Sequence, residues 1–429
     1  MKLSPVAGIV AASAFLGVSR AQEQETDPVL LLSSDSAFHA EMLGGMGYAI
    51  GGGADISPIL AAAKDVIPGD FERFGDVFFK LAEETKSQAL DPDNAYDPVN
   101  VRDTWFSTAN YFRRADMFLH GNWSNPALET YWEEQLNAFN QGIAALPVPG
   151  ERIQIPADNF TVEAIWYSAS PDNSTKRPTL IIGNGFDAAQ EDIYHTLAAH
   201  ALARGWNALT YEGPGQPTVR RSQNLGFIHQ WERVVTPAVD YLLENKSSEI
   251  DTERLVLFGN SLGGYLAARA AAFEPRIKAV MLNGGIYDLH EGYTAQLTTD
   301  LAELYHSGQK DLFDEAALSI LDDRNVSSQL RWGIEYGLWA FNVKSPYDFL
   351  QLTQQYTVKD ILSLIKVPVW VADFEFEGIF TGQPQRVKDA LGDLGTLHTF
   401  NGSAGYHCQP GAYMEMNRAV FAWLHKTLG

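Results

Sequence analysis

One stretch of the sequence, residues 254–265, constrains the fold more than any other. It reads RLVLFGNSLGGY: an apolar run at Leu255–Phe258 expected to form a strand, then Gly259-Asn260-Ser261-Leu262-Gly263, then an alanine-rich segment expected to be helical to about residue 273. A G-x-S-x-G turn between strand and helix is typical of a nucleophile elbow, which raises the serine hydroxyl above the strand ends. The alternative is a tight turn in which Ser261 only caps the helix. The strand before the turn and the extra glycine at Gly264 favour the nucleophile.

The region from residue 152 onward alternates apolar strands with helical segments. The predicted strands are residues 152–156, 160–168, 178–185, 206–211, 255–258, 277–285, 367–374 and 396–402. The predicted helices are residues 187–204, 229–245, 262–273 and 411–428. The first two strands read as a hairpin, and the later alternation predicts a parallel sheet with right-handed crossovers, the α/β class.

Two other regions are predicted to be helical without strands. The first carries apolar residues at helical spacing in residues 56–63, 71–86, 101–119 and 126–145. The second, residues 287–360, interrupts the α/β alternation and is interpreted as a helical lid over the strand ends, where such sheets bind ligands. The predicted organisation is a signal peptide at 1–21, a helical cap-forming domain at 22–150, a core in two parts at 151–286 and 361–429, and the lid at 287–360.

The beginning of the chain and its sequons predict passage through the secretory pathway. Lys2, an apolar run and the small residues around Ala21 resemble a cleavable leader that is too short to span a bilayer. Six Asn-x-Ser/Thr sequons are candidate glycosylation sites: Asn122, Asn159, Asn173, Asn245, Asn325 and Asn401. The single cysteine, Cys408, allows no intrachain disulfide and is expected to be a packing residue. The expected location is outside the cell or in the lumen of the secretory pathway.

The charge and composition of the chain limit the kinds of molecule that it is expected to bind. A net charge of −22 disfavours nucleic acid and anionic membrane surfaces. No His, Cys or acidic residues have metal-ligand spacing, and no glycine pattern indicates a nucleotide, so neither metal nor cofactor is expected. The expected partner is a small-molecule substrate, and the choice between a monomer and a homodimer stays open.

His407 is the predicted base. It follows the last predicted strand, in the loop Gly402–Cys408, and comes after the serine and the acid in chain order. A near-neutral pKa suits an imidazole to take the Ser261 proton and to return it to a leaving group.

The acid is expected in the loop after residues 367–374. Three carboxylates compete there, Asp373, Glu375 and Glu377. Glu377 lies furthest from the strand and is favoured to reach Nδ1 of His407, since glutamate is an accepted alternative to aspartate in such triads.

An oxyanion hole needs two backbone amides aimed at the developing charge. The amide of Leu262 directly follows the nucleophile, and the second is expected at Phe186, in the loop after strand 178–185. Gly183 and Gly185 allow a close approach of the backbone, or form an ordinary turn. Asp187 and Glu191 either orient this loop or cap the next helix.

Several motifs together resemble a known family. They are GNGFDAAQEDIY, EGPGQ, WERVVTPAVDYL, GNSLGGYLAARAAAFEPRIKAVMLNGG, GQPQRVKDAL and HCQPGA. They resemble the fungal α/β-hydrolases of polyketide and cytochalasan gene clusters, including fusarin-type and pigment-shortening hydrolases. More distantly, they are similar to FrsA-like esterases and to pseudooxynicotine hydrolase, which cleaves a C–C bond. The resemblance covers roughly residues 40–429.

The resemblance implies an α/β-hydrolase fold with an N-terminal helical domain that closes the pocket. It places Ser261 at the family nucleophile and His407 in the family's His-Cys-Gln motif. The family acid is an aspartate shortly before Gly-Gln-Pro, where this chain has Glu377, and Tyr406 stands where the family often has an acidic residue. A leader peptide is also unusual for a pathway hydrolase of this kind.

The sequence therefore predicts a serine hydrolase acting on a carbonyl of a polyketide-like metabolite, at a C–C bond next to a ketone or at an ester. Three alternatives stay open. They are a secreted general carboxylesterase, a ring-forming or acyl-transfer enzyme on the same triad, and a catalytically silent binding protein.

Overall fold

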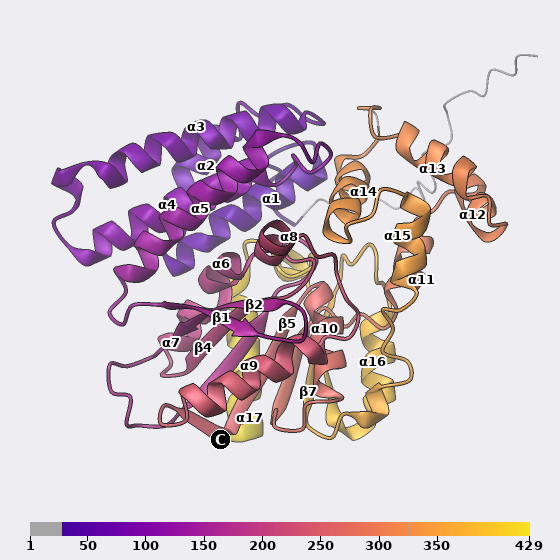
Figure 1. The fold of residues 1–429 in the computed structure, drawn as a ribbon. Helices are drawn as coiled ribbons and strands as arrows, with labels where there is room; N and C mark the ends of the chain where they lie inside the picture. Colours follow the sequence, from indigo (N-terminus) through magenta and orange to yellow (C-terminus); the bar gives the residue numbers. More distant parts are fainter. Residues whose placement is uncertain (1–27, 325) are drawn as a thin grey trace, which may run out of the picture.

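The computed structural model describes residues 28–324 and 326–429 of the chain (Figure 1). Within these residues, eight strands form one sheet in the order β1-β2-β4-β3-β5-β6-β7-β8. The strands are β1 (Glu151–Pro156), β2 (Thr161–Tyr167), β3 (Arg177–Gly183), β4 (Asn207–Glu212), β5 (Ile250–Asn260), β6 (Ala279–Asn283), β7 (Val369–Phe374) and β8 (Gly395–Phe400). The expected leader at residues 1–21 and the sequon at Asn325 lie outside the described residues.

The sheet is parallel except at one edge. β1 pairs antiparallel with β2, and β2 with β4, whereas each pair from β4 through β8 is parallel. The register aligns Gly183 of β3 with Gly259 of β5, and Asn260 of β5 with Asn283 of β6. The loops after these strands therefore meet at the carboxyl edge of the sheet, as expected for an α/β-hydrolase fold.

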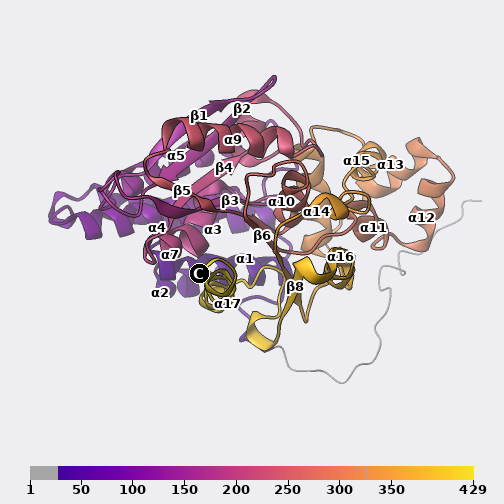
Figure 2. The same cartoon turned by 90° about the horizontal axis from the view of Figure 1, so that it is seen from below.

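Helices cover both faces of the sheet because neighbouring side chains on a buried strand point to opposite faces. Leu257 packs in a cluster with α9 (Glu232–Asn245), α10 (Leu262–Ala271) and α16 (Gln383–Leu391). Val256, the preceding residue, packs in the opposite cluster with α17 (Tyr413–Leu428). Figure 2 shows α9 and α17 on opposite sides of the strands.

The N-terminal helices lie above the carboxyl edge of the sheet in the view of Figure 1. They are α1 (Ser36–Gly47), α2 (Ile56–Ala62), α3 (Phe71–Leu90), α4 (Pro98–Asp116) and α5 (Pro126–Ala144). A core of their own, rich in phenylalanine, includes Phe38, Phe74 and Phe118 with ring centroids 4.6–5.0 Å apart. Asp97 sets the start of α4 by accepting hydrogen bonds from the amides of Val99 and Asn100.

The insertion helices lie beside the N-terminal helices over the same edge of the sheet (Figure 1). They are α11 (Leu289–Thr294), α12 (Thr299–His306), α13 (Lys310–Ser319), α14 (Ser328–Ala340) and α15 (Pro346–Thr353). Two side chains of α14 join the two groups of helices: Arg331 Nη1 donates to the carbonyl of Gly69 at 3.0 Å, and Trp332 Nε1 donates to that of Met117 at 3.2 Å.

Several predicted boundaries were wrong. The helix expected at 187–204 begins at Gln190 and is divided into α6 (Gln190–Ile193), a π-helical turn (Tyr194–Ala198) and α7 (Ala199–Leu202). Its first residues instead form a loop, because Asp192 caps the amide of Ala189 at 2.9 Å. The helices α8 (Pro217–Gln223) and α16 were not predicted. Each is a single short helix that begins with proline in its first turn, directly after a loop.

Candidate active site

Ser261 lies between β5 and α10 in a backbone conformation that L-residues rarely adopt, with φ 58° and ψ −126°. Its amide donates to the carbonyl of Asn283 on the neighbouring strand at 2.8 Å, which anchors the turn to the sheet. Strain of this kind is characteristic of functional turns that the surrounding structure holds in place. The predicted elbow is therefore present in the fold.

The glycines around Ser261 are required by close packing. A Cβ on Gly259 would lie 1.8 Å from the carbonyl oxygen of Gly263, and a Cβ on Gly264 would lie 1.9 Å from that of Gly284. Both contacts are with backbone atoms, which cannot move aside as a flexible side chain can. The sharp turn that presents Ser261 therefore depends on these positions having no side chain.

Ser261, His407 and Glu377 form a continuous hydrogen-bonded chain. Ser261 Oγ lies 2.9 Å from His407 Nε2, and His407 Nδ1 lies 2.6 Å from Glu377 Oε2. The other carboxylate oxygen, Oε1, accepts hydrogen bonds from the amides of Ile379 at 3.0 Å and Phe380 at 3.2 Å. The Glu377 side chain is only 5% exposed, and its orientation is fixed by the three contacts with His407, Ile379 and Phe380. This arrangement is that of a nucleophile, a base and an orienting acid.

The two other carboxylates considered as the acid do not contact His407. Asp373 lies within β7 and its carboxylate accepts a hydrogen bond from the amide of Phe374, the next residue. Glu375 Oε2 accepts from the amide of Gly402 at the start of the loop that carries His407. Of the three, Glu377 is the one positioned to act on the imidazole.

The contact between His407 and Glu377 favours the protonated imidazole and the ionised carboxylate. Burial opposes ionisation of Glu377, but the imidazole of His407 and the two amides hold the pKa of its carboxyl at about 2. Burial likewise opposes protonation of His407, yet the Cys408 sulfur and the Glu377 carboxylate outweigh it and raise the imidazole pKa well above its ordinary value. A carboxylate that stabilises an imidazolium is the electrostatic requirement for a base that must hold a proton during reaction.

The amides of Leu262 and Phe186 are available for an oxyanion. Among the described residues, neither amide donates a hydrogen bond to another protein group. The loop after β3 passes close to the start of α10, because a Cβ on Gly185 would lie 2.6 Å from the Leu262 nitrogen. The lack of a side chain at Gly185 therefore brings the Phe186 loop against the elbow, as the predicted oxyanion hole requires.

Aromatic side chains of the insertion helices surround this loop. The Phe186 ring lies 5.2 Å from Tyr336 and 6.1 Å from Trp332 between ring centroids, and Phe380 lies 6.4 Å from His407. Tyr293 lies near both Phe186 and Phe380, at 6.5 and 6.3 Å. The surroundings of the elbow are thus apolar and aromatic, which suits a hydrophobic, ring-containing ligand.

Two features near the site were not recognised in the sequence. Arg113, within the segment 101–119 that was predicted only to be helical, is buried and donates to the carbonyl of Asp187 at 2.6 Å. Gln216 donates to the carbonyls of Asn184 and Gly185 at 2.7 and 3.2 Å. The EGPGQ motif was the only local signal for Gln216.

Cys408, the residue after His407, has φ 59° and its Sγ donates to the carbonyl of Asn283 at 3.3 Å.

Within residues 28–324 and 326–429, no group of three His, Cys, Asp or Glu side chains is arranged to hold a metal ion. No helix in the same residues combines the length and apolar character needed to cross a bilayer. The described sequon asparagines, Asn122, Asn159, Asn173, Asn245 and Asn401, are all exposed.

The fold and site define an α/β-hydrolase with a serine elbow. Comparison with known proteins supports the same class. The prolyl oligopeptidase family matches residues 235–325, the segment that contains Ser261. The solved structure of 2,6-dihydroxy-pseudo-oxynicotine hydrolase superposes with a TM-score of 0.64 at 18% identity, covering 89% of this chain and 95% of that one. AbyA5 superposes with a TM-score of 0.60 at 15% identity, covering 85% and 89% of the two chains.

Similarity in sequence extends over most of the chain. Hydrolase LUC6 of a Fusarium species is 29% identical over 408 residues, covering 91% of this chain and 96% of its own. The 20-hydroxy-prefusarin hydrolase FUS2 of Gibberella moniliformis has the same identity and coverage, and hydrolase acrC of Aspergillus aculeatus is 28% identical over 411 residues. The chain is therefore a hydrolase, and the resemblance to fungal metabolite hydrolases expected from its motifs is confirmed.

Proposed function

We propose that this hydrolase uses Ser261 to cleave a carbonyl compound of polyketide type, at a C–C bond next to a ketone or at an ester. The hydrogen-bonded chain from Ser261 through His407 to Glu377 is the observation that carries the proposal. The names of similar fungal proteins, 20-hydroxy-prefusarin hydrolase among them, support a secondary metabolite as the substrate class.

In the proposed mechanism, Ser261 Oγ adds to the substrate carbonyl carbon while its proton passes to His407 Nε2. Glu377 stabilises the imidazolium through the 2.6 Å contact with Nδ1. The carbonyl oxygen, now an oxyanion, accepts hydrogen bonds from the amides of Leu262 and Phe186. Collapse of this intermediate breaks the bond to the leaving group, which takes the proton from His407. Water, activated by the same imidazole, then releases the acid from Ser261.

A C–C substrate makes a stronger demand on His407 than an ester does. The leaving group of a β-diketone is an enolate carbon, which must receive a proton to leave as a ketone, whereas the oxygen of an activated ester leaves more readily. The raised pKa of the imidazole beside Glu377 keeps the proton on His407 until the leaving group takes it. The aromatic surroundings of Phe186 also favour a large apolar substrate over a small polar one.

The serine is tested by fluorophosphonate labelling with peptide mapping. We expect a label on Ser261 in the wild type and none in Ser261→Ala. Ser403→Ala is the matched control, since Ser403 is exposed in the loop that carries His407. Labelling that persists in Ser261→Ala, or a folded wild type that does not label, would count against the proposal and favour a silent binding protein.

The bond is tested with a matched pair of substrates, an aryl β-diketone and the aryl ester of the same acid. Cleavage of the β-diketone yields a carboxylic acid and a ketone, and cleavage of the aryl ester yields the same acid and a phenol. A preference in kcat/KM for the diketone supports a C–C hydrolase. A preference for the ester, with no ketone released, supports a carboxylesterase instead.

We further propose that the protein passes through the secretory pathway and acts on small molecules there or outside the cell. The exposed positions of the described sequon asparagines support glycan attachment. Expression in a fungal host, with enzymatic deglycosylation of the protein from medium and from cells, checks this. Protein found only in the cytosol without a glycan would refute the proposal.

A further inference from the structure

The loop that carries Phe186 has its carbonyls held by side chains from distant parts of the chain. Gln216 donates to the carbonyls of Asn184 and Gly185 at 2.7 and 3.2 Å. At the end of the loop, Asp192 accepts a hydrogen bond from the Ala189 amide at 2.9 Å. The Phe186 amide, between these fixed points, makes no hydrogen bond within the described residues.

The carbonyl of Asp187 is where three parts of the molecule meet. Arg113, on α4 of the N-terminal helices, donates to it from Nη2 at 2.6 Å. Tyr336, on α14 of the insertion helices, donates to it from its hydroxyl at 3.3 Å. The carbonyl belongs to the residue directly after Phe186, so these two donors fix the backbone next to the candidate oxyanion amide.

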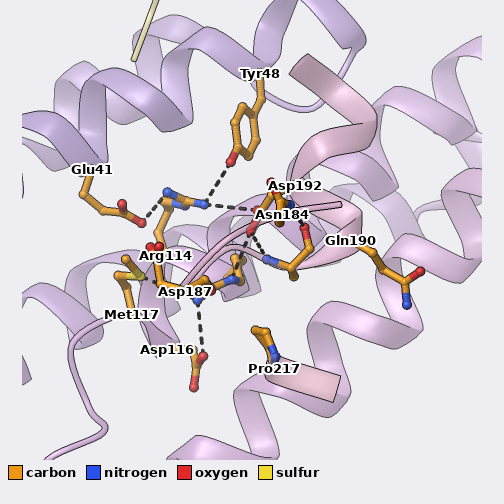
Figure 3. Close-up of polar contacts among 12 residues, drawn as sticks. Glu41, Tyr48, Arg114, Asp116, Met117, Asn184, Asp187, Gln190, Asp192 and Pro217 are labelled. Carbon is orange, nitrogen blue, oxygen red and sulfur yellow. Dashed lines mark hydrogen bonds and ion pairs between the residues drawn. The ribbon is translucent and has the colours of Figure 1, made fainter. Parts of the chain in front are cut away.

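Arg113 is itself held in place by buried charges. Its Nε lies 3.3 Å from Asp192 Oδ2 and its Nη1 lies 3.4 Å from Asp116 Oδ2, and the side chain is 3% exposed. The neighbouring Arg114 contacts Asp192 at 3.2 Å and also pairs with Glu41. Figure 3 shows Arg114 between Glu41 and Asp192, with the Tyr48 hydroxyl at the same end of the guanidinium as Asp192. The planar guanidinium of Arg113, held at Nε by Asp192 and at Nη1 by Asp116, is a rigid donor from Nη2 toward the carbonyl of Asp187.

We propose that Arg113 and Tyr336 are positioning residues of the oxyanion hole, acting through the carbonyl of Asp187 on the amide of Phe186. Neither residue touches the reacting atoms in this arrangement. Their effect is to hold the Phe186 peptide in the orientation that the developing oxyanion needs. Catalysis therefore depends on the packing of both the N-terminal helices and the insertion helices against this loop. The inference rests on the proposed serine mechanism.

A purely structural role is the competing explanation, because a buried arginine among carboxylates also holds helices together. The two roles differ in what they change. A positioning role lowers stabilisation of the tetrahedral state while leaving ground-state binding intact, so kcat falls and KM does not. A structural role lowers the unfolding temperature and leaves the kcat of the folded fraction unchanged.

Tyr336→Phe is the principal variant, since it removes one hydroxyl and keeps the buried ring. Arg113→Lys retains the positive charge and loses the fork of donors. Tyr305→Phe is the control for the first, because that hydroxyl accepts hydrogen bonds from Gln351 and Gln354, both within the insertion. Arg114→Lys is the control for the second, as Arg114 shares Asp192 but makes no contact with the carbonyl of Asp187.

The measurement is the affinity of an aryl trifluoromethyl ketone and of its methyl ketone analogue by calorimetry, with kcat and KM on the aryl ester. The fluorinated ketone accepts Ser261 Oγ at its carbonyl carbon, the serine proton passes to His407, and the new oxyanion occupies the hole. The methyl ketone reports ground-state binding. In Tyr336→Phe we expect the affinity for the fluorinated ketone and kcat each to fall by about 10-fold. In Arg113→Lys both should fall by about 100-fold. The affinity for the methyl ketone and KM should change by no more than about twofold in either variant.

The outcomes separate this inference from the proposed function. If the fluorinated ketone binds wild type and Ser261→Ala equally, the serine mechanism fails and the positioning role fails with it. If tight binding needs Ser261 but Tyr336→Phe and Arg113→Lys match their controls, the serine mechanism stands and the positioning role is refuted. Equal losses for both ketones would likewise refute it.

Discussion

The carboxylate of Glu377 lies 2.6 Å from Nδ1 of His407 through one oxygen and accepts two backbone amides through the other. The acid is therefore fixed from both sides, although its side chain is one methylene longer than aspartate. The extra length is used to reach the imidazole from a position beyond the end of β7.

Loss of this carboxylate should lower activity without unfolding the protein. In Glu377→Gln the amide presents the wrong charge, and its nitrogen can favour the wrong tautomer of His407. We expect kcat/KM on an activated ester to fall by about 10³–10⁴-fold, the scale seen when a triad acid is neutralised. Asp373→Asn is the control, since its carboxylate bonds the next amide in its own strand and should change kcat/KM by less than about threefold. Equal losses in both variants would mean that Glu377 is not the triad acid.

The pH profile should show the influence of Glu377 on His407. The base must be neutral to accept the serine proton, and its pKa is raised, so kcat/KM should increase as pH rises through a value above the ordinary 6.5. Removing the charge in Glu377→Gln destabilises the imidazolium, so the acid limb should move to lower pH while the plateau falls. Rates over a wide pH range for wild type, Glu377→Gln and Asp373→Asn check this. An acid limb at the same pH in all three proteins would contradict it.

The close approach at the elbow predicts a steric effect that is specific to position. Gly264→Ala places a Cβ against the backbone of Gly284 and should cost about 3 kcal/mol in the free energy of unfolding. Gly333→Ala is the control, because Gly333 lies within α14 with nothing within 4 Å of an added Cβ. There, replacing glycine in a helix should stabilise by about 0.5–1 kcal/mol. Urea denaturation of both variants measures the difference, and a neutral Gly264→Ala would show that the turn can relax.

Buried and exposed ion pairs should differ sharply in their effect on stability. Asp116 is 1% exposed and binds Arg221 through both oxygens at 2.9 and 3.0 Å, with Arg113 at 3.4 Å. Asp116→Ala leaves Arg221 without this buried carboxylate and removes one of the two carboxylates that Arg113 contacts, and it should cost about 3–5 kcal/mol. Glu84→Ala, which removes an exposed pair with Lys80 at 3.8 Å, should change the unfolding free energy by at most about 0.5 kcal/mol. Comparable losses in the two variants would refute the distinction.

Local patterns predicted the parts of the site that depend on neighbours in sequence. The glycines around Ser261 predicted the tight turn directly. His407 was predicted because it follows the last strand, in the chain order serine, acid, histidine of an α/β-hydrolase. The apolar runs of β3, β5 and β6 predicted the central sheet because strands buried on both faces need apolar side chains throughout.

Other parts of the site could not be predicted, because they depend on contacts between distant residues. The sequence favoured Glu377 over Asp373 and Glu375 as the acid, but the contact itself depends on the path of the chain after β7, where three carboxylates follow each other within five residues of sequence. The contact of Arg113 with Asp187 joins residues 74 positions apart, and no periodicity reports it. The helix expected at 187–204 lacks its first turn because Asp192 accepts a hydrogen bond from the amide of Ala189, so that the helix begins at Gln190.

The order of the catalytic groups along the chain has a consequence for synthesis. A ribosome releases the N-terminal helices first, then the nucleophile Ser261, and the imidazole of His407 only 146 residues later. On the proposed mechanism, a nascent chain carries a serine without a base until His407 has been added. A product truncated between α10 and residue 407 would carry the elbow sequence and the N-terminal helices without the imidazole that activates the serine, so such incomplete copies would be chemically inert.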